Sequence, residues 1–502
     1  MEIKATHLSA MITKTKKSET FTYKTCRTAR VTRDARYDGL IFSGASTTKI
    51  YCRPICPGTP PLESNNIYFR NRAQAEAEGF RPCLRCRPEL APGMPIRIAN
   101  SWVIRNALER IHKGIPPHDA FIPQATKIKE PAGYQPTDFD SVVGTTLANY
   151  RKTFQLGFAK MLLTDTSLPI EDIADASGFA GTQGMLDALA NLYNRDPLTF
   201  RKPLPVHTQQ GLKSCSLMLA YRPPFDWPAL LNYFRTRAIV GVEKVENEVY
   251  SRSFYLNGHQ GWLSLQNASK LNSIRMEVHS SNLKCLMQIV WRVRRMFDLD
   301  ANPLKLNSFF RTDSILGPTW LRHSGIRVPV AWHAFEFAVR AIVGQLLSIV
   351  VATKLMGRIA DAFSKDLSLP APKGIEKVFP NPAVLQTADI RSCGLTRNKA
   401  AAIASLAREV NNGTLDLEMT TDLDTFIKQC VAIKGIGEWT AQTIAMRGLG
   451  DPDAFPASDL GIVKTFSDDG QPLKPTQIHN MAEHWRPWRA YAAMLLWMKR
   501  RK

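Results

Sequence analysis

Residues 433–459 constrain the fold more than any other stretch of this 502-residue chain. They begin with Lys-Gly-Ile-Gly at 434–437, a tight turn, and continue as an apolar-periodic helix through residue 447, with a glycine stop at 448–450. A Gly-x-Gly turn that enters a helix lets backbone N–H groups approach a phosphate closely. One carboxylate, Asp459, follows about twenty residues later, before another helical start. The pattern predicts a phosphate-binding turn at Gly435 and Gly437 that brings one acid to a nucleoside.

This stretch resembles the helix-hairpin-helix superfamily of DNA glycosylases. The motifs are Gly-Ile-Gly-Glu-Trp-Thr-Ala from 435, Phe-Pro-Ala-Ser-Asp-Leu-Gly-Ile-Val-Lys from 455 and Trp-Arg-Pro-Trp-Arg-Ala-Tyr from 485. Over residues 221–502 the chain is similar to DNA-3-methyladenine glycosylase II. The resemblance implies that Asp459 is catalytic and that Trp439 and Trp497 line the base pocket, with Thr443 where the family has a tyrosine. The alternative is an inert hairpin module that only holds the DNA backbone.

The implied reaction explains these residue types. A purine alkylated at N3 or N7 is already cationic, so it leaves without protonation. Aromatic rings select the cation by cation–π stacking, and a carboxylate stabilises the sugar oxocarbenium and accepts a proton from water. Strand-cleaving members of the superfamily carry a lysine at the position of Trp439, so we expect a monofunctional glycosylase.

Two further features follow from the resemblance. Gln345 and Leu346 would enter the minor groove, where Leu346 fills the gap left by the extruded base. At helical spacing the alternative is that Leu346 belongs to the core. Carbonyl groups at 431–436 would bind a monovalent cation.

Composition points to a polyanionic partner. Lys and Arg number 65 and Asp and Glu 44, a net charge of +21, so we expect double-stranded, alkylated DNA as the partner. Residues 1–90 carry a net +8 and residues 97–204 only +1. With no apolar run of 18 residues, we expect no membrane segment. We expect a monomer in a bacterial-type cytoplasm, associated with the nucleoid.

Four of the nine cysteines are clustered. The pairs Cys52/Cys56 and Cys83/Cys86 can converge four thiolates tetrahedrally, which predicts one Zn²⁺ in a site of four cysteines. The surrounding motifs, Tyr-Cys-Arg-Pro-Ile-Cys and Gly-Phe-Arg-Pro-Cys-Leu-Arg-Cys-Arg-Pro, resemble the N-terminal domain of the Ada protein. The resemblance implies that Cys52 accepts a methyl group from a DNA methylphosphotriester. We expect phosphate contacts from Arg53, Arg81, Arg85 and Arg87. The alternative is a structural zinc knuckle that grips DNA.

Residues 147–201 resemble an AraC-type DNA-binding domain, but the signal is degraded. The first helix-turn-helix, expected around 125–143, carries two prolines and no arginine. The second recognition helix, 182–193, has one acid and no basic residue, which leaves Gln183 and Asn191 for readout. Promoter recognition, with RNA polymerase as a partner, and a retained structural connector both stay open.

The sequence predicts a multidomain α+β protein. We expect an Ada-like zinc module of α/β type (1–95), an all-α helix-turn-helix region (96–206), an antiparallel-sheet subdomain (215–328) and an all-α helix-hairpin-helix catalytic domain (329–502). Strands are expected at 40–42 and 50–51, then at 217–221, 249–256, 261–265 and 274–279. Helices are expected at 97–112, 144–163, 228–238, 283–297 and, as one long helix, 332–363. Two rival functions remain: a transcriptional activator whose glycosylase-like half only binds DNA, and a repair enzyme whose front half merely tethers DNA.

Overall fold

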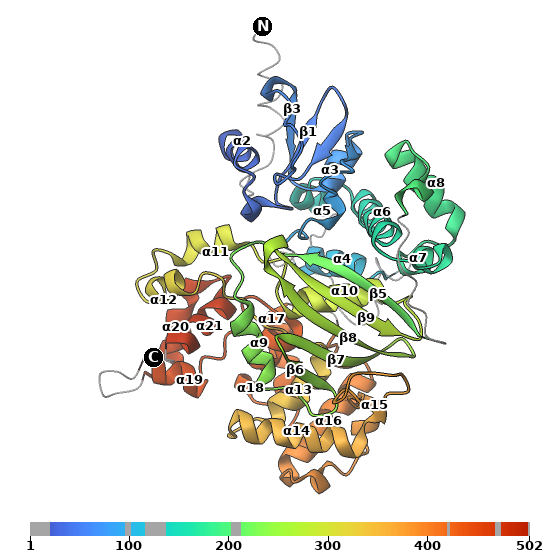
Figure 1. Ribbon diagram of the computed structural model, residues 1–502. Coiled ribbons are helices and arrows are strands. Elements are labelled where there is room, and N and C mark those ends of the chain that lie inside the picture. The colour runs from blue at the N-terminus through green and yellow to red at the C-terminus, as the bar shows by residue number, and fades with distance from the viewer. Residues whose placement is uncertain are drawn as a thin grey trace. The chain divides into compact units, whose positions relative to one another are not determined.

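The computed structural model describes residues 21–95, 102–115, 137–201, 212–418, 422–466 and 473–499 (Figure 1). The chain divides into two units. The first comprises residues 1–94, 107–164 and 169–202, and the second comprises 95–106, 165–168 and 203–502. No helix among the described residues is long and apolar enough to cross a membrane.

The first unit opens with a four-stranded sheet of order β3-β1-β2-β4. Its strands are β1 (Phe42–Ala45), β2 (Ile50–Cys52), β3 (Asn66–Phe69) and β4 (Arg81–Pro82). Gly44 is required in β1, because a Cβ there would lie 2.7 Å from the rings of Phe69 and Phe80. The strand expected at 40–42 starts two residues later than predicted, at Phe42, because residues 38 and 41 form only an isolated bridge.

Helices complete the first unit. They are α2 (Tyr23–Val31), α3 (Arg72–Ala77), α5 (Thr137–Val143), α6 (Leu147–Asp165), α7 (Ile170–Ala176) and α8 (Thr182–Tyr193); α4 (Trp102–His112) spans the division between the units. The hydroxyls of Tyr51 and Thr153 both donate to Glu76, so α3 and α6 are joined through a buried carboxylate. Burial raises the pKa of Glu76. Residues 125–136 of the expected first helix-turn-helix lie outside the described residues.

The second unit begins with a five-stranded antiparallel sheet of order β5-β9-β8-β7-β6. On β9, Ile274, Met276 and Val278 are fully buried and alternate with more exposed residues, which fixes which face of the strand meets the core. The strands are β5 (Lys213–Ala220), β6 (Glu243–Glu246), β7 (Val249–Leu256), β8 (His259–Ala268) and β9 (Ser273–Ser280). Four of them include or overlap the predicted segments. The short, mostly charged β6 was not predicted, because it carries no alternating apolar pattern.

The rest of the second unit is almost entirely helical. The helices are α9 (Trp227–Arg235), α10 (Leu286–Met296), α11 (Pro303–Phe310), α12 (Gly317–Arg322), α13 (Ala334–Val343), α14 (Ile349–Phe363), α15 (Pro382–Leu385), α16 (Arg397–Asn411), α17 (Leu423–Val431), α18 (Glu438–Ile444), α19 (Leu460–Thr465), α20 (Pro475–Ala482) and α21 (Arg489–Lys499). A two-stranded ribbon, β10 (Lys365–Asp366) with β11 (Lys377–Val378), follows α14. One large apolar cluster runs through these helices and includes Trp320, Met446 and Trp485.

Two helix predictions need correction. The single helix expected over 332–363 is interrupted after Val343, because residues 344–348 form a turn in which Leu346 is left-handed (φ +57°). The helix after the hairpin remains α-helical only to Ile444 and then widens into a π-helical segment, Ala445–Leu449. Gly450 ends it in the left-handed conformation (φ +69°), which is the expected glycine stop.

Candidate active site and metal centre

Asp459 lies at the start of α19, where its side chain caps the helix. Its Oδ1 accepts hydrogen bonds from the backbone N–H groups of Gly461 (2.9 Å) and Ile462 (3.2 Å). The Ser-Asp-Leu-Gly sequence favours this geometry, because aspartate is among the preferred N-cap residues. The carboxylate position is therefore set by the helix that the residue itself begins.

Two indole rings fix the same carboxylate from the side. Trp497 Nε1 donates to Oδ1 at 2.8 Å, and Trp439 Nε1 donates to Oδ2 at 3.1 Å. Gly461 makes room for this, since a Cβ there would lie 2.9 Å from Asp459 Oδ1 and 3.0 Å from Trp497 Cδ1. Segments from α18, α19 and α21 thus meet at one acid. Among the described residues Oδ1 has three donors and Oδ2 has one, so Oδ2 keeps acceptor capacity.

Tyr233, which the sequence motifs did not single out, lies near Trp497 on the other side of Arg447. Arg447 is only 7% exposed, and its guanidinium carbon lies 5.0 Å from the ring centroid of Trp497 and 4.7 Å from that of Tyr233. Tyr233 belongs to α9, in the sheet subdomain. No local motif marks Tyr233, because its place depends on how α9 packs.

Thr443 lies one turn after Trp439 on α18. Its hydroxyl donates to the carbonyl of Trp439 at 2.6 Å, so the polar group is used within the helix. A cleft of about 250 Å³ runs beside Trp439. Its other lining residues are Glu438, Gln442, Pro456, Ala457, Ser458, Pro475, Thr476, His479 and Asn480. Asp459 and Trp497 are not among the residues that line it.

The hairpin lies between α17 and α18. Gly435 has φ +95°, and a Cβ there would lie 2.7 Å from the Cβ of Ala402 on α16, so glycine is required by both backbone and packing. Gly437 is the N-cap of α18, where a Cβ would meet nothing within 4 Å. The turn thus needs only the first of the two glycines for steric reasons.

Gln345 and Leu346 form the turn between α13 and α14. Gln345 Nε2 donates to the carbonyl of Gly435 (2.9 Å) and to the hydroxyl of Thr440 (3.0 Å), which joins this turn to the hairpin. Leu346 is 98% exposed. The alternative that Leu346 belongs to the core is therefore wrong, because the helix that would have buried it ends at Val343.

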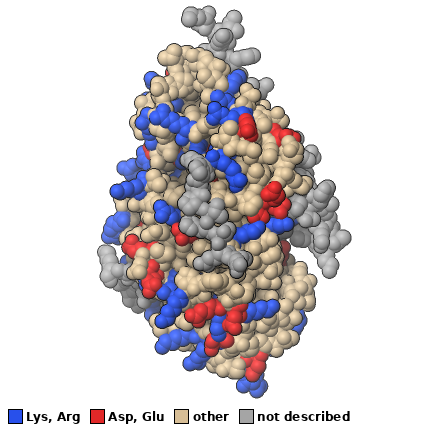
Figure 2. All heavy atoms as spheres, turned by 45° about the vertical axis from the view of Figure 1, so that its right-hand side comes forward, with Lys and Arg blue, Asp and Glu red and all other residues tan. Residues whose placement is uncertain are grey.

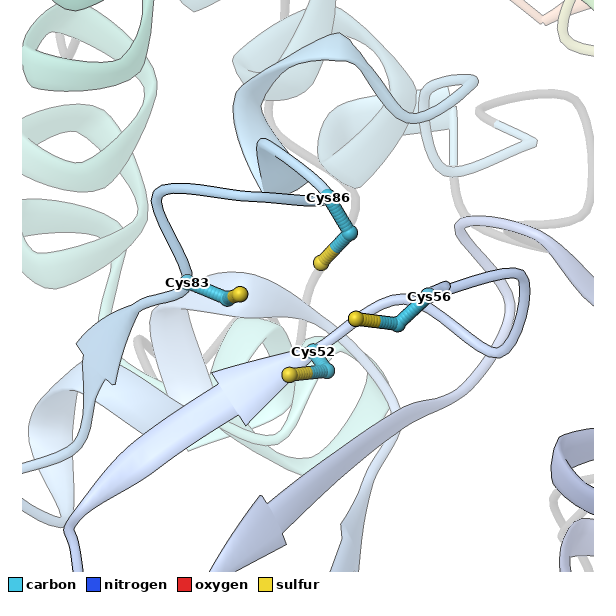
Figure 3. Close-up of side chains that lie close together, drawn as sticks. All are labelled: Cys52, Cys56, Cys83 and Cys86. Carbon is cyan, nitrogen blue, oxygen red and sulfur yellow. The ribbon is translucent and has the colours of Figure 1, made fainter. Parts of the chain in front are cut away.

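The four clustered cysteines converge in the first unit (Figure 3). The Sγ atoms of Cys52, Cys56, Cys83 and Cys86 all lie within 4.8 Å of one another. Four thiolates around one point suit the tetrahedral preference of Zn²⁺. Backbone N–H groups support three of the sulfurs: Gly58 donates to Cys56 and Arg53 donates to Cys86, both at 3.4 Å, and Cys86 donates to Cys83. For Cys52 the described residues give no such donor.

Arg53 does not fit the phosphate-binding role that the sequence suggested. Its guanidinium is buried, donates through Nε to Asp38 at 2.9 Å, forms an ion pair with the same carboxylate and donates to the carbonyl of Cys86 at 3.3 Å. It therefore holds the two cysteine loops together. Arg85 is exposed, Arg81 is half-buried, and Arg87 pairs with Glu89 at 2.9 Å.

Different parts of the chain match different protein families. Residues 25–89 match the metal binding domain of Ada, residues 216–333 the AlkA N-terminal domain, and residues 339–490 the HhH-GPD superfamily of base excision DNA repair proteins. Together with the four-cysteine cluster, the first match identifies a zinc site. Fold and sites define a base excision DNA repair protein of the HhH-GPD superfamily that carries an Ada-type zinc domain.

The relatives name the family. A probable bifunctional transcriptional activator/DNA repair enzyme AlkA from Mycobacterium tuberculosis is 30% identical over 478 residues, covering 95% of this chain and 96% of the relative. The chain belongs to this AlkA family of bifunctional proteins. DNA-3-methyladenine glycosylase 2 of Escherichia coli is 31% identical over 282 residues, covering 56% of this chain and 95% of that protein. The 3-methyladenine DNA-glycosylase from Archaeoglobus fulgidus shares the fold over 56% of this chain and 97% of its own, with a TM-score of 0.50 and 23% identity.

Proposed function

We propose that the chain excises alkylated purines of the 3-methyladenine type from duplex DNA by hydrolysing the N-glycosidic bond, with Asp459 as the catalytic carboxylate. The observation that carries this is the placement of Asp459 between the indole N–H groups of Trp439 and Trp497, 3.1 and 2.8 Å away. The rings that stack on a cationic base therefore also hold the acid that faces its sugar.

The reaction uses few groups. The C1′–N bond breaks with its electrons going to the alkylated purine, which leaves neutral, and C1′ becomes an oxocarbenium. The Asp459 carboxylate stabilises that charge, and Oδ2, with a single donor, accepts the proton when water attacks C1′. Trp439 offers no amine for a Schiff base, so the strand stays intact.

DNA engagement is supported by one feature of the second unit and by the charge of the whole chain. Leu346 is almost fully exposed on a turn tied to the hairpin by Gln345, which suits an apolar wedge that replaces an extruded base. Lys and Arg side chains are spread over the face drawn in Figure 2, among Asp and Glu. The net charge of +21 over the whole sequence gives the protein a long-range attraction to the phosphate backbone.

The zinc site supports a second activity. We propose that Cys52 attacks the methyl carbon of a methylphosphotriester: an S–C bond forms, the C–O bond breaks, and the phosphodiester leaves as an anion. Zinc keeps the thiols ionised at neutral pH. Cys56 and Cys86 each accept a backbone N–H, whereas Cys52, at the end of β2, has no such donor among the described residues. Its thiolate therefore lacks the backbone hydrogen bond that these other two sulfurs accept, which favours it as the nucleophile.

The name of the Mycobacterium tuberculosis relative also includes transcriptional activation, which would need a helix-turn-helix that reads DNA bases. Helices α7 and α8 have the spacing of a helix-turn-helix, but Gln183 donates to Asp187 on its own helix at 2.7 Å. At the other end of α8, Tyr193 and Phe200 pack beside the buried Lys160. These contacts support α8 as a structural part of the first unit rather than as a reader of bases.

The deciding experiment is base release from N-methylated duplex DNA by the full chain. We expect free 3-methyladenine by chromatography, with strands that break only after alkali treatment. Absence of base release together with intact DNA binding would make the second unit a binding module, and the activator alternative would then take first place.

A further inference from the structure

The turn that carries Leu346 holds an unfavourable conformation in two respects. Its backbone is left-handed (φ +57°), a region that leucine rarely adopts, and its side chain is 98% exposed to water. Such a conformation persists only when neighbouring groups over-determine it. The groups that hold this turn therefore decide whether Leu346 is ready before the protein meets DNA.

Lys399, in the first turn of α16, supplies the strongest contacts. Its Nζ donates to the carbonyl of Val343 at 2.9 Å and to the carbonyl of Gln345 at 2.7 Å. Val343 is the last residue of α13 and Gln345 lies just beyond it, where carbonyls have no partners within the helix. Hydrogen bonds from a charged donor are among the stronger ones in proteins. Partial burial lowers the pKa of Lys399, as expected for an ammonium aimed into the protein.

The same helix also supports the hairpin. Ala402, three residues after Lys399, fills the space that a Cβ on Gly435 would occupy. Gln345 then bridges the two elements directly through its bonds to Gly435 and Thr440. The helix α16 thus supports both the turn that carries Leu346 (residues 344–348) and the hairpin turn (residues 434–437). Both turns lie in the second unit with α13, α14 and α18 (Figure 1).

We propose that Lys399 is a positioning residue: by holding the carbonyls on both sides of Gly344, it pre-forms the Leu346 turn in the DNA-free protein at a fixed distance from the hairpin. The proposal rests on the proposed function in so far as Leu346 acts as the wedge. Lys399 itself touches no base in this account. Its effect passes entirely through the conformation of residues 344–347.

The test uses the full chain and a duplex that needs no catalysis. The probe carries a tetrahydrofuran abasic site opposite 2-aminopurine, whose fluorescence rises when the wedge unstacks it. Lys399→Met removes the charged donor and keeps the aliphatic stem, whereas Lys399→Arg keeps a donor. Arg397→Met, an exposed residue of the same helical turn, is the matched charge-loss control. Lys399→Met removes both charge-assisted bonds, and the loss of even one corresponds to about tenfold in an equilibrium constant. We expect about tenfold weaker probe binding with little fluorescence rise for Lys399→Met, and values within about threefold of wild type for the other two.

A double-variant cycle separates positioning from other roles. If Lys399 acts through the wedge, Lys399→Met adds less than about twofold to the defect of Leu346→Ala. Full additivity, or an equal loss in Arg397→Met, would overturn the proposal, because the lysine would then act as a phosphate contact. Equal melting curves for Lys399→Met and Lys399→Arg exclude simple unfolding of α16. A protein that unstacks the probe but releases no base would refute the proposed function and leave this inference standing.

Discussion

Replacing Asp459 by asparagine keeps the size of the side chain and removes its charge. The structure allows one orientation of the amide. Its oxygen must take the place of Oδ1, which receives three donors from Gly461, Ile462 and Trp497. The amide nitrogen then replaces Oδ2 and faces the indole N–H of Trp439, so two donors meet at about 3 Å.

The expected magnitudes follow from these contacts. The unpaired indole N–H costs about 1–3 kcal/mol in stability, while the N-cap bonds of α19 remain. Loss of the charge that stabilises the oxocarbenium should lower single-turnover base release by about a hundredfold to a thousandfold. Binding to a tetrahydrofuran duplex should change by less than about threefold, because the proposed role of Asp459 is to face the sugar and not to hold the phosphate backbone.

The assay is single-turnover release of 3-methyladenine, with thermal unfolding of the second unit measured in parallel. Asp422→Asn is the matched control, since it changes an N-cap aspartate that caps α17 instead of α19. The double variant Asp459→Asn with Trp439→Phe removes the opposing donor, so it should recover stability without recovering the rate. Base release within about threefold of wild type for Asp459→Asn would refute the assignment of Asp459 as the charge that drives the reaction.

Further predictions concern the zinc module and the pocket. Cys52→Ser should abolish methyl transfer and weaken zinc retention, as measured by a colorimetric chelator, and stripping zinc should leave base release within about twofold of the untreated protein. Arg53→Met should destabilise the first unit by about 3–5 kcal/mol in thermal unfolding, because the buried Asp38 carboxylate would lose its ion pair with Arg53. Arg85→Met should leave stability unchanged and reduce the salt dependence of DNA binding by about one charge, whereas an equal loss of stability would contradict its exposed position. Thr443→Tyr should narrow the pocket and shift selection towards small methylated purines in competition assays; unchanged ratios would show that this position does not face the base.

The sequence determined the chemistry of both sites, because that chemistry resides in short motifs. Four cysteines in two close pairs specify a metal whatever the surrounding fold, and the structure brings their sulfurs within 4.8 Å. The Gly-x-Gly turn and the carboxylate about twenty residues later likewise predicted one site, since hairpin, helix and cap are all local. Most strands of the second unit could be predicted for the same reason, because buried and more exposed residues alternate along them, as on β9.

Only the tertiary structure decided which side chains are free to act. Arg53 stands in a basic motif, but Asp38 and the carbonyl of Cys86 draw it into the interior. Leu346 stands in an apolar run that reads as one helix, but bonds from Lys399, fifty-three positions later in the sequence, hold the end of α13 and leave the leucine in solvent. The place of Tyr233 beside Arg447 depends on how a helix of the sheet subdomain packs. Long-range contacts of this kind produce no periodic pattern in the sequence, because the two partners come into contact only after folding.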